Sequence, residues 1–406
     1  MNILLSTYSF GAGRGSEAGV GWNVARGLAL RGHSVTVLTT SEFRYLNEPA
    51  LQKERLNITL IEEDCGIRDF PRSDSYRKWQ RRIVPIIRSL SARQHFDLIH
   101  HITLNQYRWA HDVFSTNLPY VIGPVGGAEL VPTPLLRYGH LPLAMLIKEI
   151  MRRCTLDVIP LIRRCKKHRK SGIVLASNQA TADRLKKLPI RPIICPAIAV
   201  HRHEIISSPA PLDAHASFIL FDGSLTRSQK GVRLALRTIC QLWKKGVQVP
   251  LRIVGLSPND ATIIIHYAQE TGLPDKALQL EGQVTRSTML QYMQQAVVMF
   301  SCVYRDSGSM ALLEALAQGS RIVCLEIPSQ EWLPEQFCHK VAVQPTSAAM
   351  EEALASALQQ EIAAPANTEE WHANRVQWIE QNMTWDARLD TFEELYHQIL
   401  SKKPSA

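Results

Sequence analysis

The sequence has few cysteines and no long apolar runs. Its 8 cysteines are scattered over 406 residues without a CxxC pair, which argues against a zinc site and favours reduced thiols in the cytosol. No apolar run approaches the roughly 20 residues that a membrane-spanning helix needs. Disorder-like composition, internal repeats and low-complexity tracts are also lacking. The chain is therefore expected to form two ordinary globular domains.

The N-terminal region lacks two sequence signals, a secretory signal peptide and a dinucleotide-binding glycine loop. MNILLSTYSF lacks the basic start of a signal peptide and leads directly into Gly11 and Gly13, so we expect a first strand there and a cytoplasmic protein. The glycine loop that follows is not the dinucleotide fingerprint GxGxxG. It is too long, and no acid closes the second strand, Ser34 to Thr40.

Positive charge is concentrated in the first half of the chain. Of the net charge of +9, residues 1–206 contribute +14 (30 Lys and Arg against 16 Asp and Glu) and the remainder −5. Two basic tracts carry much of the excess, Arg72 to Arg93 and Arg152 to Lys170, and the second has Leu, Ile and Val among its basic residues. Such segments favour an anionic membrane surface, whereas a solvated helix face is the alternative. No nucleic-acid-binding motif accompanies them, so no nucleic-acid partner is expected.

The most informative stretch runs from Val297 to Glu326. Its pattern predicts a strand, a polar loop, a helix that Ser309 caps and Gly319 ends, and a second strand. The start of that helix, next to Gly308, is suited to an anion because its backbone amides are unpaired there.

Two carboxylates interrupt this stretch. Asp306 lies in the loop and Glu314 lies five residues past the cap. Acids beside a phosphate would repel it, so we expect them to hold hydroxyl groups. A ligand with phosphate and polyol parts, such as a nucleotide sugar, satisfies both features, whereas an ordinary Rossmann-like helix with incidental acids is the alternative.

These residues resemble the retaining glycosyltransferases of family 4 (glycosyl transferases group 1), which have the two-domain glycosyltransferase-B fold. The family motif is an acid, seven residues and Glu, followed by small residue–x–Gly–x–x–Val. Asp306 and Glu314 have that spacing, and Ala317 to Val323 has that tail. The first acid is commonly Glu in the family, so Asp306 is a departure that leaves the sugar preference open.

The glycine-rich opening of the chain also resembles this family. The string GSEAGVGW begins at Gly15, and Ser16 is expected to cap the helix that follows. The resemblance implies that the loop faces the interdomain cleft, with Gly15 at the donor and Glu17 at the acceptor. A simple tight turn remains the alternative for Gly11 and Gly13.

Polar residues at two further strand ends are candidates because ligands of open α/β sheets bind at the carboxyl ends of strands. His100 and His101 are adjacent on a strand, so they point to opposite faces and at most one enters a cleft. Resemblance to the family's Asp–x–x–His motif favours His101 as the donor-sugar contact and leaves His100 open, on the acceptor side. Glu129, after GPVGGA, is expected to bind acceptor, with a helix-start acid as the alternative.

A Pro-containing segment, Ser207 to Ala216, predicts the domain boundary. The expected domains are 1–206 and 207–384, with a terminal helix near 385–400 packing back on the first. In the second domain, the resemblance implies that the loop after the first strand binds the diphosphate of the donor through Gly223, Arg227 and Lys230. We call these three residues the diphosphate clamp. Ser224 stands where the family has Arg, and Arg227 is expected to supply the missing charge. Gly255 and Val284, at two further strand ends, are expected to frame the nucleotide base.

The resemblance covers nearly the whole chain and implies two Rossmann-like domains with parallel sheets facing across a cleft. The expected reaction moves a hexose from a UDP- or GDP-linked sugar to a hydroxyl of a glycan or lipid-linked acceptor, with retention, in bacterial surface polysaccharide synthesis. Lys230, Asp306 and His101 are the expected catalytic residues. The backbone amides of Gly308 and Ser309 are expected to bind the donor, and Glu314 is expected to bind its ribose. No divalent metal and no further cofactor is expected.

Two alternatives stay open at this point. A catalytically inactive, membrane-associated scaffold is favoured by Ser224. A nucleotide-sugar epimerase of the same fold would need an acid/base pair of its own.

Overall fold

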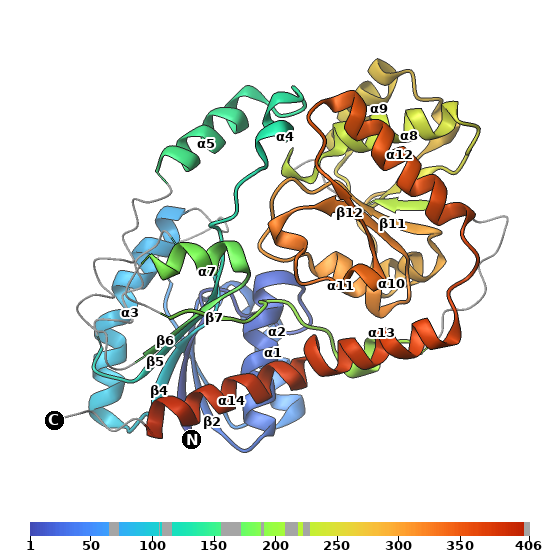
Figure 1. Cartoon of the computed structure of the whole chain (residues 1–406). Coiled ribbons are helices and arrows are strands. Elements are labelled where there is room, and N and C mark those ends of the chain that lie inside the picture. The colour runs from blue at the N-terminus through green and yellow to red at the C-terminus, as the bar shows by residue number, and fades with distance from the viewer. Residues whose placement is uncertain are drawn as a thin grey trace. The chain divides into compact units, whose positions relative to one another are not determined.

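The structure is a computed structural model that describes residues 1–64, 73–104, 106–107, 116–155, 172–187, 191–207, 218–221 and 228–401. The chain divides into two compact units (Figure 1). Unit 1 comprises Met1–Ala128, Leu156–Ala199 and Thr384–Ala406, and unit 2 comprises Glu129–Thr155 and Val200–Met383. Residues 129–155 are therefore grouped with unit 2, although they precede the boundary predicted between residues 206 and 207.

Unit 1 is built on a seven-stranded parallel sheet with the order β3-β2-β1-β4-β5-β6-β7. Its strands are β1 Asn2–Ser6, β2 Ser34–Thr39, β3 Ile58–Glu62, β4 Leu98–His101, β5 Tyr120–Val125, β6 Gly172–Ala176 and β7 Ile193–Ile194. β2 and β3 lie on one side of β1, and β4 lies on its other side. The strand order thus reverses between β1 and β4, and ligands of open α/β sheets bind at such a switch point.

Helices cover this sheet and close the core of unit 1. They are α1 Ser16–Leu30, α2 Arg44–Glu54, α3 Ser73–Arg93, α7 Gln179–Lys186 and α14 Trp385–Ser401, with a short 3-10 turn at η1 Ser41–Phe43. The terminal helix α14 runs beside α1 and buries Leu389, Phe392 and Tyr396 in the core around β1 and β4 (Figure 1). The last described helix of the chain is therefore part of unit 1.

Unit 2 has a six-stranded parallel sheet with the order β10-β9-β8-β11-β12-β13. Its strands are β8 Ile219–Phe221, β9 Leu251–Ile253, β10 Leu278–Leu280, β11 Val298–Ser301, β12 Ile322–Glu326 and β13 His339–Ala342. The order reverses here too, between β8 and β11. The two parallel sheets confirm the predicted fold class of two Rossmann-like domains.

The helices of unit 2 are α4 Thr133–Arg137, α5 Leu143–Cys154, α8 Val232–Lys244, α9 Pro258–Thr271, α10 Arg286–Gln295, α11 Met310–Ala317, α12 Ser347–Ala363 and α13 Glu369–Asn382. Short 3-10 turns lie at η3 Arg202–Glu204, η4 Ser228–Lys230, η5 Asp275–Ala277, η6 Pro328–Gln330 and η7 Glu335–Phe337. Within the described ranges, no helix has the length and apolar character needed to cross a membrane.

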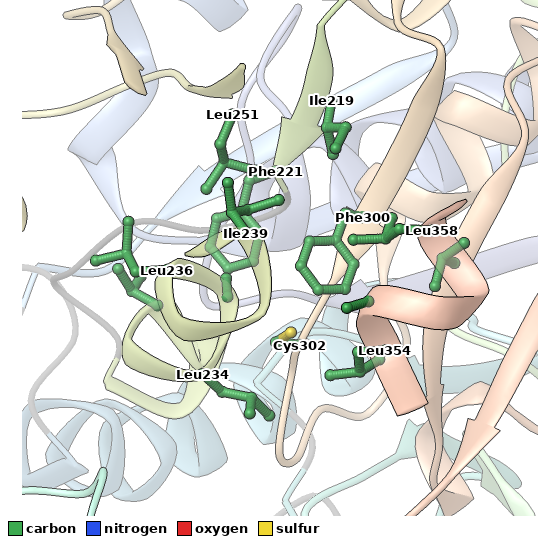
Figure 2. Packing of buried hydrophobic residues seen from close by; sticks show 14 of the residues in the cluster. Ile219, Phe221, Leu234, Leu236, Ile239, Leu251, Phe300, Cys302, Leu354 and Leu358 are labelled. Carbon is green, nitrogen blue, oxygen red and sulfur yellow. The ribbon is translucent and has the colours of Figure 1, made fainter. Parts of the chain in front are cut away.

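The core of unit 2 lies between its sheet and the helices α8 and α12. Leu236 and Ile239 of α8 are fully buried, as their spacing on one helix face predicts. Figure 2 shows Ile239 of α8, Phe221 of β8, Phe300 of β11 and Leu358 of α12 within this one buried cluster. β8 and β11 are paired in parallel, so the loops that follow them emerge from one edge of the sheet.

Candidate functional site

Lys230 and Asp306 meet where the strand order of unit 2 reverses. Lys230 follows β8 and Asp306 follows β11, and the Lys230 Nζ lies 3.7 Å from Asp306 Oδ2. Their side chains are 16% and 29% exposed, respectively. The pair therefore places a cation and a carboxylate together at the position where such sheets bind ligands.

Gly231 holds the loop that carries Lys230 against the loop after β11. Its φ is 72°, a left-handed value, and a Cβ there would lie 2.2 Å from the carbonyl oxygen of Cys302. The Tyr304 amide donates to the carbonyl of Gln229 at 2.8 Å. Because the two backbones touch, no side chain fits at position 231, and Lys230 is set next to the Asp306 loop.

The predicted ends of the helix after Asp306 are confirmed. Ser309 is the N-cap of α11, with its Oγ accepting from the Leu312 amide at 3.4 Å. Gly319 follows the helix with φ 79°. Asp306 Oδ1 accepts from the Ser307 amide at 2.8 Å, which helps to fix the carboxylate in the loop directly ahead of the helix. Gly308 lies between this carboxylate and the cap.

Glu314 is paired with an arginine that the sequence analysis did not single out. Arg286, the first residue of α10, forms ion pairs with Glu314 and, at 2.6 Å, with Glu204. Burial opposes the charge of Arg286, but its hydrogen bonds and attraction to the two carboxylates outweigh this effect and raise its pKa. Since Arg286 lies two residues after Val284, it joins the loop after β10 to α11.

Gly255 and the segment before Val284 also come together at this edge of the sheet. The Gly255 amide donates to the carbonyl of Gly282 at 3.0 Å, and Gln283 Nε2 donates to the carbonyl of Gly255 at 3.0 Å. Gly255 has a φ of 85°. The two strand ends predicted to frame a nucleotide base are therefore hydrogen-bonded neighbours.

Residues 129–155 hold the Asp306 loop on both sides of the carboxylate. The Ser307 hydroxyl donates to Glu129 Oε2 at 3.4 Å, and Arg305 Nε lies 3.6 Å from Glu149 Oε2. Glu129 is 1% exposed. Its described contact is thus to the loop, and the acceptor-binding role of Glu129 stays a prediction.

Both histidines at the end of β4 are fully buried in unit 1. His101 Nδ1 lies 2.9 Å from Ser6 Oγ, and its Nε2 lies 2.6 Å from the Tyr76 hydroxyl. His100 likewise contacts Tyr396 and the carbonyl of Gly123. Since both ring nitrogens of each histidine have partners, a sugar or acceptor contact requires one hydrogen bond to be exchanged. The roles of His101 and His100 stay predictions.

The glycine loop of unit 1 differs from the prediction at its helix start. Helix α1 begins at Ser16 itself, with Gly15 as the N-cap residue, so the assignment of Ser16 as the cap was wrong. Among the described residues other than its two chain neighbours, none has a heavy atom within 4 Å of a Cβ built on Gly15. Glu17 Oε2 accepts from the Leu104 amide at 3.0 Å and so ties the loop to the end of β4. The donor and acceptor roles of Gly15 and Glu17 stay predictions.

Two residues of the predicted diphosphate clamp, Gly223 and Arg227, lie outside the described residues, and so does Ser224. Most of the predicted linker, Ser207 to Ala216, lies outside them too. Within the described ranges, no group of three or more His, Cys, Asp or Glu side chains is arranged to hold a metal ion. The expectation of metal-independent chemistry is a prediction to be tested in solution.

Comparison with known proteins agrees with the fold. Residues 216–360 match the family model of the glycosyl transferases group 1. Sucrose-phosphate synthase from Thermosynechococcus elongatus superposes with a TM-score of 0.70 at 16% identity, over 99% of this chain and 100% of that chain. The chain has the glycosyltransferase-B fold. The resemblance to the glycosyl transferases group 1 is thereby confirmed.

Two more solved structures show the same glycosyltransferase-B fold. One is WaaG, a glycosyltransferase involved in lipopolysaccharide biosynthesis, with a TM-score of 0.63 and 15% identity over 97% of this chain and 99% of that chain. The other is HepE from Anabaena in complex with UDP and glucose, with a TM-score of 0.61 and 12% identity over 98% of this chain and 100% of that chain. No curated protein matches the chain in sequence.

Proposed function

We propose that this protein is a glycosyltransferase that moves a hexose from a nucleotide-diphosphate sugar to a hydroxyl group, with retained anomeric configuration. The observation that carries the proposal is the pairing of Lys230 with Asp306, 3.7 Å apart at the strand reversal of unit 2 and directly ahead of the N-terminus of α11. A cation, a carboxylate and the amides of a helix N-terminus suit the diphosphate and sugar parts of such a donor.

The difficult part of the reaction is the departure of the nucleoside diphosphate. The acceptor oxygen bonds to the anomeric carbon on the face that the diphosphate leaves, the bond to the diphosphate breaks, and the diphosphate departs with the electron pair and takes up the proton of the acceptor hydroxyl. Lys230 and the amides of Gly308 and Ser309 stabilise its growing negative charge. Asp306 pairs with Lys230 in the structure. When the donor binds, Lys230 turns to the diphosphate and Asp306 accepts from sugar hydroxyls.

The remaining donor contacts follow the strand ends of unit 2. Glu314, oriented by Arg286, takes the ribose hydroxyls, and Gly255 and Val284 frame the base. Gly223 and Arg227 complete the diphosphate clamp, and His101 and Gly15 contact the donor from unit 1. Glu17, His100 and Glu129 serve the acceptor.

The acceptor is proposed to be a glycan or a lipid-linked glycan of bacterial surface polysaccharide synthesis. The net charge of +14 over residues 1–206 suits work at the cytoplasmic face of an anionic membrane. The fold relative WaaG is involved in lipopolysaccharide biosynthesis, and the HepE structure holds UDP and glucose. These relatives support a UDP-hexose as the first donor to test.

A thermal-shift screen with UDP, GDP and their sugars tests the donor site. A nucleotide sugar at 100 times its Kd stabilises the folded protein by about 2.7 kcal/mol. Lys230→Ala is expected to abolish this shift. Lys245→Ala, which removes the exposed pair with Glu352 from the same unit, is the matched control and leaves the shift intact. A full response in the Lys230 variant would contradict the proposal.

An inactive scaffold is the second candidate, and the serine at position 224 favours it because the family has arginine there. A scaffold shows no nucleotide-dependent shift, and substitution of Lys230 or Asp306 changes nothing in it. Detection of a glycosidic product excludes both this candidate and an epimerase. NMR of the anomeric proton of that product tests retention.

A further inference from the structure

Helix α5 exposes a row of large apolar side chains. Leu143 is 72% exposed, Ile147 48%, Ile150 49% and Met151 60%. At about 3.6 residues per turn, offsets of four, seven and eight residues place all four on one helix face, within an arc of about 100°. Single exposed apolar residues are common on protein surfaces, but four in a row on one helix indicate an interaction surface. We call these four residues the α5 stripe.

The opposite face of α5 is fixed to unit 2, so the stripe is held facing outward. Glu149 is 4% exposed, accepts from the Val131 amide at 3.1 Å and lies 3.6 Å from Arg305. In the loop just before α5, His140 lies 3.1 Å from the Ser347 hydroxyl and 3.3 Å from that of Tyr304. Burial, together with the nearby charges of two arginines, lowers the pKa of His140 to about 4, so this contact uses the neutral imidazole at neutral pH.

The charge of this helix selects the kind of surface that the stripe would meet. Besides the stripe, α5 carries three basic residues, Lys148, Arg152 and Arg153, and a single acid, the buried Glu149. Arg152 lies 3.5 Å from Glu149 and Arg153 donates to the Val131 carbonyl, so both are held toward unit 2, whereas Lys148 is exposed. The sequence then continues into RRCKKHRK at positions 163–170, which lie outside the described residues. An apolar stripe on a basic helix complements the interface of an anionic bilayer, where apolar side chains enter the headgroup boundary and cations reach lipid phosphates.

We propose that the α5 stripe docks on the surface of an anionic phospholipid bilayer. This inference rests on the peripheral-membrane part of the proposed function and assigns it to a named helix. Because Arg305 adjoins Asp306 and pairs with Glu149 of the same helix, docking would also bring the loop proposed to bind the donor close to the bilayer. That arrangement suits an acceptor held in the membrane by a lipid.

Flotation of the full-length protein with vesicles tests the proposal without any need for transferase activity. The vesicles contain phosphatidylcholine alone or mixed with phosphatidylglycerol. Wild-type protein is expected to float with the anionic vesicles and not with the neutral ones. A variant with Ile147→Ser, Ile150→Ser and Met151→Ser should partition at least about tenfold more weakly. Ile265→Ser, at a 45% exposed isoleucine of α9, is the matched control and should float like wild type.

Three outcomes would overturn the proposal. Equal flotation of the stripe variant and wild type would assign membrane binding to another tract. Equal binding of wild type to neutral vesicles would remove the selectivity for anionic lipid. A wild-type dimer on size exclusion that the stripe variant loses would make a second copy the occupant. An unchanged circular dichroism spectrum shows that the stripe variant folds. A thermal shift with UDP-sugar that matches wild type shows that its donor site is intact, so the docking proposal and the donor-site proposal can fail separately.

Discussion

His100 and Tyr396 are joined by a buried hydrogen bond of 2.6 Å within unit 1. The other ring nitrogen of His100 lies 2.9 Å from the carbonyl of Gly123, which can only accept. Nε2 therefore carries the proton, and Nδ1 accepts from the Tyr396 hydroxyl. The ring is thus held neutral between β4, β5 and the terminal helix α14.

This arrangement predicts acid-sensitive stability. Burial lowers the pKa of His100 from 6.5 to about 4, so below pH 6.5 the unfolded chain binds a proton that the folded chain does not. The free energy of unfolding should be fully retained above pH 6.5 and fall by roughly 3 kcal/mol as the pH drops to about 4. Urea unfolding of the full-length protein at a series of pH values measures this loss.

A pair of histidine variants checks the assignment. His100→Gln is less stable at neutral pH because hydrogen bonds are lost, but its stability depends less on pH. His266→Gln, at an exposed position, should keep the wild-type profile. An unchanged pH profile in the His100 variant would show that another group is responsible, and His140 of unit 2, whose pKa is also about 4, is then the next to test.

Gly231→Ala is expected to damage both stability and donor binding. The added Cβ meets the Cys302 carbonyl oxygen at 2.2 Å, and the left-handed φ alone costs about 1–2 kcal/mol. Gly246→Ala has the same kind of φ, 86°, but no atom within 4 Å of its Cβ, so it reports the backbone strain alone. Calorimetry should show a larger loss for position 231, and only that variant should weaken nucleotide binding. Equal losses of stability in the two variants would show that the contact with the Cys302 carbonyl, just after β11, contributes nothing.

Arg286→Ala is expected to weaken nucleotide binding without unfolding the protein. Burial tends to raise the pKa of Glu204, but hydrogen bonds from Arg286 and the His201 amide outweigh it and keep that pKa low. Loss of Arg286 leaves Glu204 and Glu314 as neighbouring acids without their shared cation, so the ribose site becomes less ordered. Titration calorimetry with UDP should show a Kd raised about tenfold. Arg202→Ala, which removes an exposed pair with Glu380, is the control and should bind UDP normally.

Transferase activity is expected to survive treatment with EDTA. The proposed charge stabilisation uses Lys230, Arg227 and helix amides, which need no divalent ion. Activity is measured after chelation and again after addition of Mg²⁺ or Mn²⁺. Loss with EDTA and recovery with either ion would show that a metal neutralises the diphosphate instead.

Local sequence patterns predicted those parts of the site that depend on neighbouring residues. Ser309 and Gly319 bound α11 because capping and left-handed ends are local chemistry. The burial of His101 could not be predicted in the same way, because its partner Tyr76 comes from a helix 25 residues away. Arg286 was missed for a similar reason, since its two carboxylates are separated from it by 28 and 82 residues.

The grouping of α5 with unit 2 was also beyond local patterns. Its helical periodicity is readable in the sequence, but the contact of Glu149 with Arg305 joins residues 156 positions apart. Amphipathic spacing alone does not tell which face of a helix is buried. The structure decides this by placing the lone acid of α5 inside and the four large apolar residues outside.

The division into units has a consequence for dissecting the protein. The backbone passes from one unit to the other four times, after Ala128, Thr155, Ala199 and Met383. A single cut near residue 206 would therefore separate α4 and α5 from their packing partners and strip α14 from β4. Neither fragment is expected to fold as an independent domain, whereas the two fragments expressed together should reassemble.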